Sequence, residues 1–306
     1  MRIYRNVYER RSRTEIPPSD PDMRTAAAYF VAFSLLSGTP AVAEQDGQIA
    51  SPIALSKTNT DVQLLWARLR NGLPAELYKN FDLFIYVNKV EEGPWAQHLY
   101  AFAKPGSLNP DAEMILMLDA PVSTGRESIE RAKNGQRVST STPAGLYQFD
   151  PKRFYVEHES LQWQEEMPNA MFFDWDNKGA QTGLAIHGVT DPKAVAALGH
   201  RASAGCIQLP LAASRKLFDL VAGNFEGDVP RFAYDKNTHT TNNRGELAHD
   251  AKGKIVISHG YRALIIIENL RAGPLTSQLV IGPDAPSGEV KTASVLAGRK
   301  LVVSKD

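Results

Sequence analysis

The sequence predicts a fold that is mostly β with short helices. Short apolar runs rich in Val, Ile, Phe and Tyr recur along the chain, and turns containing Gly or Pro separate them. Two further segments carry apolar residues at the spacing of an amphipathic helix. Strands and long helices do not alternate in the βαβ manner, so we do not expect a parallel doubly wound sheet.

Each expected element follows from its local pattern. Residues 61–71 place their apolar side chains on one helical face, and a second helix over 210–221 has Pro210 in its first turn. A short helix over 126–135 is expected to end at Gly135. Strands are expected from apolar or alternating runs over 81–89, 97–104, 113–125, 145–150, 170–175, 182–188, 254–260 and 261–270.

The beginning of the chain has the pattern of a secretory signal peptide. An apolar stretch over 26–36 is too short to span a bilayer, and Ala41-Val42-Ala43 forms a small-x-small cleavage site. We therefore expect an exported protein of the periplasm or cell envelope, with a mature chain that begins near Glu44. A buried N-terminal helix is the alternative interpretation.

The expected domain organisation has four parts. Residues 1–43 are an upstream basic segment and the signal peptide, whether translation starts at Met1 or at Met23. Residues 44–79 lead into a main domain over 80–270. Residues 271–306 are rich in Pro, Gly and Ser and predict a flexible C-terminal tail.

Charge and composition argue against several classes of function. The chain has 34 basic and 34 acidic residues and no nucleic-acid-binding motif, so we expect no nucleic-acid partner. Its seven histidines are not grouped at metal-ligand spacing, so we expect neither a metal site nor another cofactor. A thiol-redox role would require a second cysteine, and the sequence contains one, Cys206.

Cys206 lies in a setting suited to nucleophilic chemistry. A lone thiol in an exported protein is a buried spectator, an intermolecular link or a reactive group. His187 ends a predicted strand, and fifteen residues separate it from Ser203, enough for a loop to bring imidazole and thiol together. An imidazole that accepts the thiol proton activates the nucleophile and should lower the pKa of the thiol below about 8.5. A core or surface histidine is the alternative interpretation of His187.

Two upstream motifs complete a recognisable pattern. Val122-Ser123-Thr124-Gly125 precedes Thr142-Pro143-Ala144-Gly145, which by itself indicates only a turn. Together with His187-Gly188 and Ser203-Ala204-Gly205-Cys206, these stretches resemble the L,D-transpeptidase catalytic domain (YkuD) family of bacterial cell-wall enzymes. The resemblance covers roughly residues 80–270, and its His/Cys half is the more specific. The chain departs from the family pattern at Ala204, often a His, and at Gln208, often Arg or Asn, which bears on substrate specificity.

The resemblance implies a β-rich sandwich with the His and Cys at one end of a cleft. It also implies an acyl transfer on peptidoglycan stem peptides. Cys206 would attack the amide between an L-centre and the terminal D-Ala, giving a thioester and releasing D-Ala. An amine of a neighbouring stem, or of an outer-membrane lipoprotein, would then take the acyl group. Such a cysteine should also be acylated by carbapenem β-lactams.

The resemblance further assigns roles to individual residues. His187 would act as the base and then as the acid, and the carbonyl of Gly188 would orient its imidazole. Gly205 and Cys206 would supply the oxyanion-hole backbone groups, because a glycine lets the chain approach a substrate carbonyl closely. Substrate binding would fall to Ser203, Thr142 and Gly145, with the Ser203 hydroxyl also expected to hold the loop.

Two alternatives for the function remain open from the sequence. Water in place of the amine would make the same site an L,D-carboxypeptidase or an amidase, or a hydrolase of a lipoprotein link. A catalytically idle cell-wall-binding module that keeps the fold belongs to a different class, and an unreactive Cys206 would favour it.

Overall fold

The computed structural model describes residues 59–104, 115–173, 176–177, 180–181, 183–235, 240–270 and 279. All of them belong to one compact unit. The predicted signal peptide lies outside the described residues, as does the predicted tail apart from Leu279, which packs against the core. None of the described helices has both the length and the apolar character needed to cross a bilayer.

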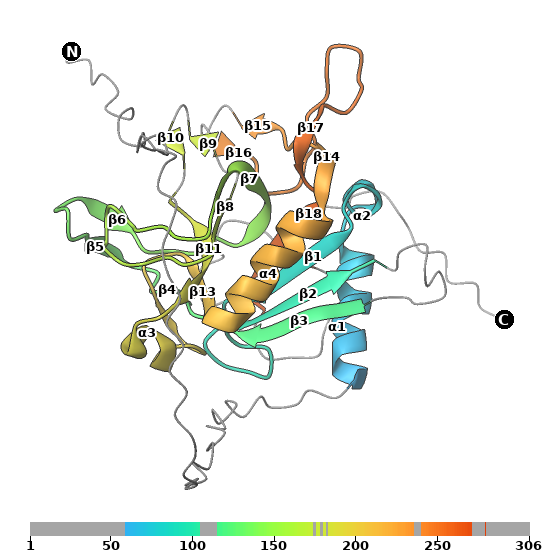
Figure 1. Cartoon of the computed structure of the whole chain (residues 1–306). Coiled ribbons are helices and arrows are strands. Elements are labelled where there is room, and N and C mark those ends of the chain that lie inside the picture. Colours follow the sequence, from blue (N-terminus) through green and yellow to red (C-terminus); the bar gives the residue numbers. More distant parts are fainter. Residues whose placement is uncertain are drawn as a thin grey trace, which may run out of the picture. The chain divides into compact units, whose positions relative to one another are not determined.

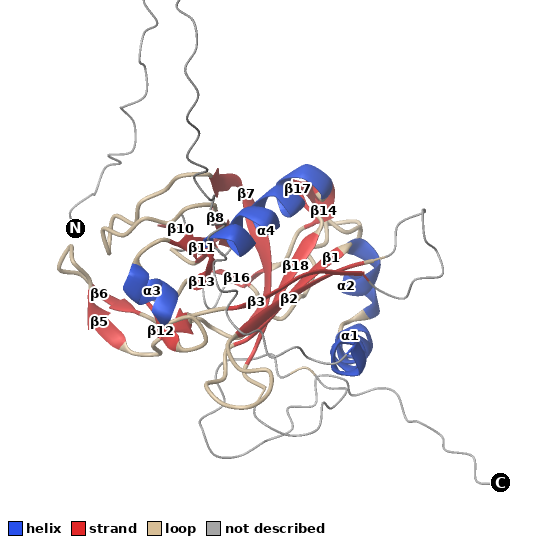
Figure 2. Ribbon diagram, turned by 60° about the horizontal axis from the view of Figure 1, so that its bottom comes forward, coloured by secondary structure: helices blue, strands red, loops and turns tan. Residues whose placement is uncertain are grey.

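An eight-stranded mixed sheet forms the centre of the fold, with the strand order β13-β11-β8-β7-β18-β1-β2-β3 (Figures 1 and 2). The β1–β18 and β11–β13 pairs are parallel, and the other neighbours are antiparallel. The strands are β1 (Leu83–Asn88), β2 (His98–Ala103), β3 (Ile115–Pro121), β7 (Gly145–Tyr155), β8 (Ala170–Phe173), β11 (Ala185–Val189), β13 (Ile207–Pro210) and β18 (Ala263–Glu268).

Shorter elements surround this sheet. The helices are α1 (Asn59–Gly72), α2 (Ala75–Asn80), α3 (Pro192–Ala196) and α4 (Leu211–Asn224). Five two-stranded pairs are β4 (Thr124–Gly125) with β12 (Arg201–Ser203), β5 (Ile129–Arg131) with β6 (Arg137–Ser139), β9 (Asp176–Asn177) with β10 (Ala180–Gln181), β14 (Glu226–Pro230) with β17 (Ile257–Tyr261), and β15 (Tyr234–Asp235) with β16 (Thr240–Thr241).

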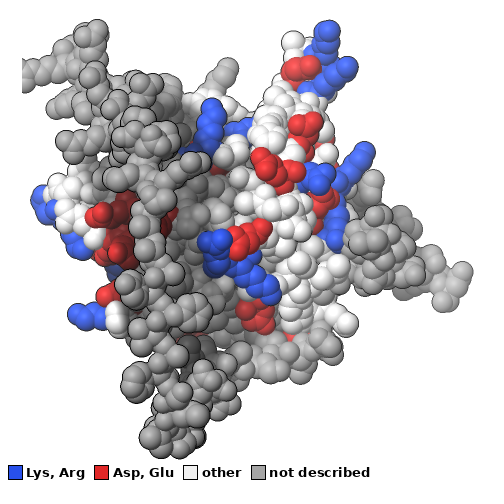
Figure 3. Space-filling view, in the orientation of Figure 1, with Lys and Arg blue, Asp and Glu red and all other residues white. Residues whose placement is uncertain are grey.

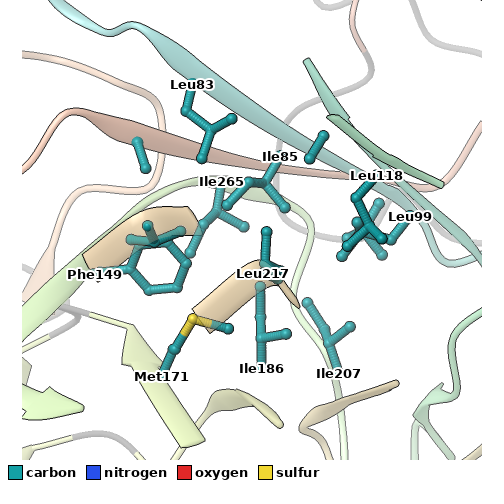
Figure 4. Close-up of a cluster of buried hydrophobic side chains, with 14 of the residues drawn as sticks. Leu83, Ile85, Leu99, Leu118, Phe149, Met171, Ile186, Ile207, Leu217 and Ile265 are labelled. Carbon is teal, nitrogen blue, oxygen red and sulfur yellow. The ribbon is translucent and has the colours of Figure 1, made fainter. Parts of the chain in front are cut away.

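The central strands of the sheet are buried on both faces, which explains their continuous apolar runs. Every residue of β1 and of β18 is buried, as expected of strands covered on two sides. On one face α4 packs between the two halves of the folded sheet, around the cluster shown in Figure 4. This first core cluster includes Leu83, Ile85, Leu99, Leu118, Phe149, Met171, Ile186, Ile207, Leu217 and Ile265. The mostly β, sandwich-like fold is therefore confirmed.

The opposite face of the sheet carries α1 and α2. Their apolar residues join alternate residues of β1, β2 and β18 in a second core cluster, which includes Leu65, Trp66, Leu69, Leu77, Phe84, Tyr86, Phe102, Leu264 and Ile266. Arg68 of α1 forms a bidentate, buried ion pair with Glu268 at the end of β18. The predicted helix over 61–71 is confirmed, and this contact fastens it to the sheet.

The two outer strands of the sheet meet near the predicted site. Ser123, just after β3, exchanges both backbone hydrogen bonds with Gln208 of β13, at 3.0 and 2.9 Å. The sheet can curve this far because β7 takes part in both halves. Its pairing with β8 shifts register between Phe149 and Phe154, around Pro151, as at a β-bulge.

The helix predicted over 126–135 is wrong, because this segment forms the β5–β6 hairpin. Ile129, Glu130 and Arg131 pair with residues 137–139, and Gly135 makes the turn with φ +84°. Ile129 is 68 % exposed, so this segment has no apolar helical face to bury. The Arg126–Glu130 ion pair has the i,i+4 spacing that suits a helix, but here it joins β5 to the residue three positions before it.

Basic and acidic side chains are mixed on the part of the surface that Figure 3 shows in colour. Figure 3 shows basic and acidic side chains next to one another over α4 and the β14–β17 pair, in agreement with the balanced composition. The arrangement does not create a field of one sign on this part of the face.

Candidate active site

His187 and Cys206 lie on the same face of two neighbouring strands. His187 is in the middle of β11, and Cys206 directly precedes β13, which pairs with β11 in parallel. Ile186 and Ile207 are register partners and both face the first core cluster. Because side chains alternate along a strand, His187 and Cys206 face the other side. There Cys206 packs against a third cluster of Met167, Ala170, Phe172 and Ala185.

The imidazole of His187 has the tautomer and the protonation state that a general base requires. Its Nδ1 lies 2.7 Å from the carbonyl oxygen of Gly188. A carbonyl can only accept a hydrogen bond, so Nδ1 carries the proton and Nε2 keeps its lone pair. Burial lowers the pKa of His187 from 6.5 to about 4, despite the Gly188 hydrogen bond that favours the charged form. The ring is therefore neutral at physiological pH.

The thiol of Cys206 is also neutral in this structure. Its Sγ donates to the carbonyl of Gly183 at 3.4 Å. Loss of solvent raises the pKa of Cys206 from 9.0 to about 11, although the Ala185 backbone N–H lowers it, and Glu165 raises it further. The expectation of a thiol pKa below about 8.5 therefore does not hold in the resting site. The pair is a thiol and an imidazole, not a thiolate and an imidazolium.

A serine fixes the loop that carries the thiol. The Ser203 hydroxyl donates to the carbonyl of Cys206 at 2.5 Å and accepts the N–H of Gly205 at 3.1 Å. Gly205 has φ +116°, a conformation that favours glycine, and a Cβ there would lie 3.1 Å from the carbonyl oxygen of Ser141. The Ser203 hydroxyl thus holds the tight turn before Cys206, which is the role expected of it.

Thr142 holds the same loop from behind. Its hydroxyl donates to the Gly205 carbonyl at 2.7 Å and accepts the N–H of Gly125 at 2.8 Å. Gly125 is packed so closely that a Cβ there would lie 2.0 Å from the carbonyl oxygen of Thr140. The upstream motifs therefore meet the cysteine loop in space. Substrate binding is predicted for Thr142, but its hydroxyl already forms hydrogen bonds with two backbone groups of the protein.

The two remaining glycines of the predicted site have different surroundings. Gly188 donates its N–H to the Pro168 carbonyl at 2.7 Å, and a Cβ there would lie 2.4 Å from Ser214 Oγ of α4. Gly188 thus lets α4 pack against the strand that carries His187. Gly145 begins β7, and a Cβ there would lie 2.9 Å from both Cβ and the carbonyl oxygen of Asn243. Gly145 therefore allows close packing against Asn243, and its assignment to substrate binding stays a prediction.

An aromatic stack beside the site was not foreseen from the sequence. His158 stacks on Tyr155, with ring centroids 5.0 Å apart, and meets the edge of Phe172 at 5.1 Å. Phe172 also belongs to the third cluster, on which Cys206 packs. The charge of His158 contributes to the lowered pKa of His187, so the two rings are close enough to interact. No local sequence pattern indicates this stack, because residues 155–158 and Phe172 meet only through tertiary packing.

The described residues contain no group of three or more His, Cys, Asp or Glu side chains that could hold a metal ion.

A family model of the L,D-transpeptidase catalytic domain (YkuD) matches residues 96–257. This match takes in the upstream motifs, His187 and Cys206. The chain belongs to this family.

Solved L,D-transpeptidases resemble the chain at low sequence identity. Residues of this chain covering 61 % of its length match 61 % of an L,D-transpeptidase fragment from Xylanimonas cellulosilytica, at 15 % identity and a TM-score of 0.31. An L,D-transpeptidase from Mycobacterium smegmatis matches at 12 % identity, 61 % and 59 % coverage and a TM-score of 0.32. An L,D-transpeptidase from Mycobacterium tuberculosis matches at 14 % identity, 61 % and 58 % coverage and a TM-score of 0.32. The chain thus spans about three fifths of these structures. A comparison with curated proteins finds no match.

Two departures of this YkuD domain from the family pattern can now be placed. Ala204 lies in the turn between Ser203 and Gly205, and it brings no polar side chain to Cys206. His200, the nearest histidine in sequence, is exposed after α3. Gln208 serves the fold through its backbone, which bonds to Ser123.

Proposed function

We propose that the protein is an exported, cysteine-dependent acyltransferase, an L,D-transpeptidase acting on peptidoglycan stem peptides. One observation carries the proposal: an imidazole with its Nε2 lone pair available lies on the same strand face as the chain's single thiol. The membership of the family and the predicted signal peptide support the substrate class and the location. Neither the formation of an acyl-enzyme nor the transfer of its acyl group to an acceptor requires a metal or another cofactor.

The chemistry begins from neutral groups. The Cys206 thiol leaves the Gly183 carbonyl and gives its proton to Nε2 of His187 as sulfur attacks the carbonyl of the L-centre–D-Ala amide. His187 becomes an imidazolium, which Nδ1–H···O=C bonding to Gly188 stabilises. The proton then passes to the departing D-Ala nitrogen as the C–N bond breaks, leaving a thioester. An acceptor amine then attacks the thioester carbonyl and loses a proton to His187. As the C–S bond breaks, His187 returns a proton to the sulfur, which restores the thiol and leaves a new amide.

The oxyanion formed at each attack needs a backbone donor beside the sulfur. In the resting site the Gly205 N–H already donates to Ser203. We therefore assign the donor role first to the Cys206 N–H. The part predicted for Gly205 is then to hold the turn that aims this group, and its own N–H would contribute only after releasing Ser203.

Muropeptide analysis tests the proposal. The mature protein, taken from Glu44, is incubated with tetrapeptide muropeptides, and products are identified by mass spectrometry. Cross-linked dimers with release of D-Ala support transpeptidation. Release of D-Ala without dimers indicates an L,D-carboxypeptidase, and attack on a lipoprotein–stem link indicates the corresponding hydrolase. No release in the presence of an intact, accessible thiol contradicts the enzymatic proposal and favours the idle wall-binding module.

A further inference from the structure

A buried polar network connects the cysteine loop with residues outside the site. Lys89, just after β1, is 1 % exposed, and its Nζ lies 3.1 Å from Oε1 of Glu127. The same Oε1 accepts the backbone N–H of Thr142 at 3.2 Å. The Thr142 hydroxyl in turn donates to the carbonyl of Gly205, the residue before the nucleophile. A chain of contacts thus runs from a buried ammonium group to the loop that carries Cys206.

The backbone at Glu127 is unusual. Its φ is +57°, a left-handed conformation that residues other than glycine adopt infrequently. Such conformations persist where the surrounding structure determines them, and they are concentrated at functional sites. The preceding residue donates its backbone N–H to the Ser203 carbonyl at 3.1 Å, so this turn also contacts the cysteine loop directly.

The base of the network is held rigidly. Gln97 is fully buried and also has a left-handed backbone, with φ +45°. Its amide donates to the carbonyl of Lys89 at 2.7 Å and to the hydroxyl of Thr124 at 2.9 Å, and it accepts the N–H of Thr124. Arg201 donates to the same Lys89 carbonyl at 2.8 Å. Lys89 is therefore fixed to both strands of the β4–β12 pair, which flanks the cysteine loop.

We infer that Glu127, charge-paired with Lys89, is a positioning residue that holds Thr142 against Gly205 and so fixes the backbone beside Cys206. The inference rests on the proposed acyl transfer for its catalytic meaning. A carboxylate suits the role because it accepts from the ammonium group and from the Thr142 N–H at once. Loss of the Thr142 contact should misplace the oxyanion donor while the thiol itself remains intact.

Removing Glu127 alone leaves the Lys89 ammonium buried without this partner, and such a variant is at risk of misfolding. A matched pair of double variants avoids the problem. Lys89→Met with Glu127→Gln keeps an oxygen that accepts from Thr142. Lys89→Met with Glu127→Leu removes that oxygen. Both variants lack the two charges, so their net charge and charge burial are equal.

Three readouts are compared in these two variants and the wild type. Acylation by meropenem depends on backbone geometry at Cys206, whereas alkylation by iodoacetamide depends only on the thiol. We expect the Leu variant to be acylated roughly tenfold or more slowly than the Gln variant, because misplaced groups at a reacting centre cost this much or more. Alkylation should differ by less than about twofold, since the thiol environment is shared.

Hydrogen exchange of the amides in residues 203–207 is the third readout and does not depend on activity. Exchange should be faster in the Leu variant than in the Gln variant. Equal acylation and equal exchange in the two variants would overturn the positioning role. If the wild type itself is not acylated, the proposed function fails, and the exchange comparison alone decides whether Glu127 positions the loop.

Discussion

The hydroxyl of Thr142 donates a 2.7 Å hydrogen bond to the carbonyl of Gly205, the residue directly before Cys206. The same oxygen accepts the N–H of Gly125 at 2.8 Å. One side chain therefore joins the two upstream motifs to the cysteine loop, which explains why these motifs accompany the cysteine in one domain.

Thr142→Val tests this contact, because valine has nearly the same shape without the hydroxyl. The buried Gly205 carbonyl and Gly125 N–H lose their partner, which should lower the free energy of unfolding by about 1–3 kcal/mol. Acylation of Cys206 should slow by roughly tenfold or more. Denaturant unfolding and meropenem acylation rates measure the two effects. Thr241→Val, at another buried threonine, serves as the control and should leave acylation unchanged. Acylation as fast in Thr142→Val as in the wild type would refute the role.

The neutral thiol and neutral imidazole predict a distinctive pH dependence. Iodoacetamide alkylation of Cys206 should keep rising with pH through 9 because the thiol pKa is about 11. Meropenem acylation should not fall as pH drops through 6.5, because His187 stays unprotonated until about pH 4. An alkylation rate that levels off below pH 8.5 would instead indicate a preformed thiolate–imidazolium pair.

The lowered pKa of His187 also affects stability. The unfolded chain binds a proton to this group below pH 6.5, whereas the folded chain does so only near pH 4. The stability from the neutral ring is therefore fully present above 6.5 and is lost as pH falls from 6.5 to about 4, by about 3 kcal/mol. His187→Gln should weaken this acid-induced loss, as measured by urea unfolding at pH 7 and pH 4.5. An unchanged difference between the two pH values would mean that His187 does not carry it.

The ion pair between Arg68 and Glu268 predicts that α1 is needed for stability. Glu268→Leu removes the carboxylate partner of the buried Arg68 guanidinium and should cost about 3–5 kcal/mol in unfolding free energy. Arg68→Met combined with Glu268→Leu should recover most of this loss, because both buried charges are then gone. Urea unfolding of Arg68→Met, Glu268→Leu and the double variant measures the coupling. Strictly additive losses would show that the two side chains do not act as a pair.

Local pattern was sufficient for much of the fold. The apolar runs that became β1, β2 and β18 and the amphipathic segment of α4 are recognisable because burial dictates their composition. The β5–β6 hairpin over 129–139 is not recognisable in this way. Residues 137–139, which pair with β5, lie outside the segment 126–135 for which a helix is predicted. Strand β7 continues to Tyr155 through Pro151, at which a strand prediction stops, since a bulge accommodates the missing N–H.

The candidate site divides in the same way. Residue type and order point to Cys206 and His187, because nucleophile and base have characteristic chemistry. The contacts of Thr142, Glu127 and Lys89 depend on segments that are far apart in the chain, and no local signal reports them. The raised thiol pKa likewise follows from burial, which a sequence does not display residue by residue.

Intact-protein mass spectrometry after incubation with meropenem tests the central claim, that Cys206 is the nucleophile, most directly. The wild type should gain the mass of one β-lactam, and peptide mapping should place it on Cys206. Cys206→Ser, with one sulfur replaced by oxygen in the same turn, should gain none and should release no D-Ala from tetrapeptide muropeptides. Ser203→Ala should still form the adduct, more slowly. A wild type that gains no mass, or a Cys206→Ser variant that still releases D-Ala, would contradict the assignment.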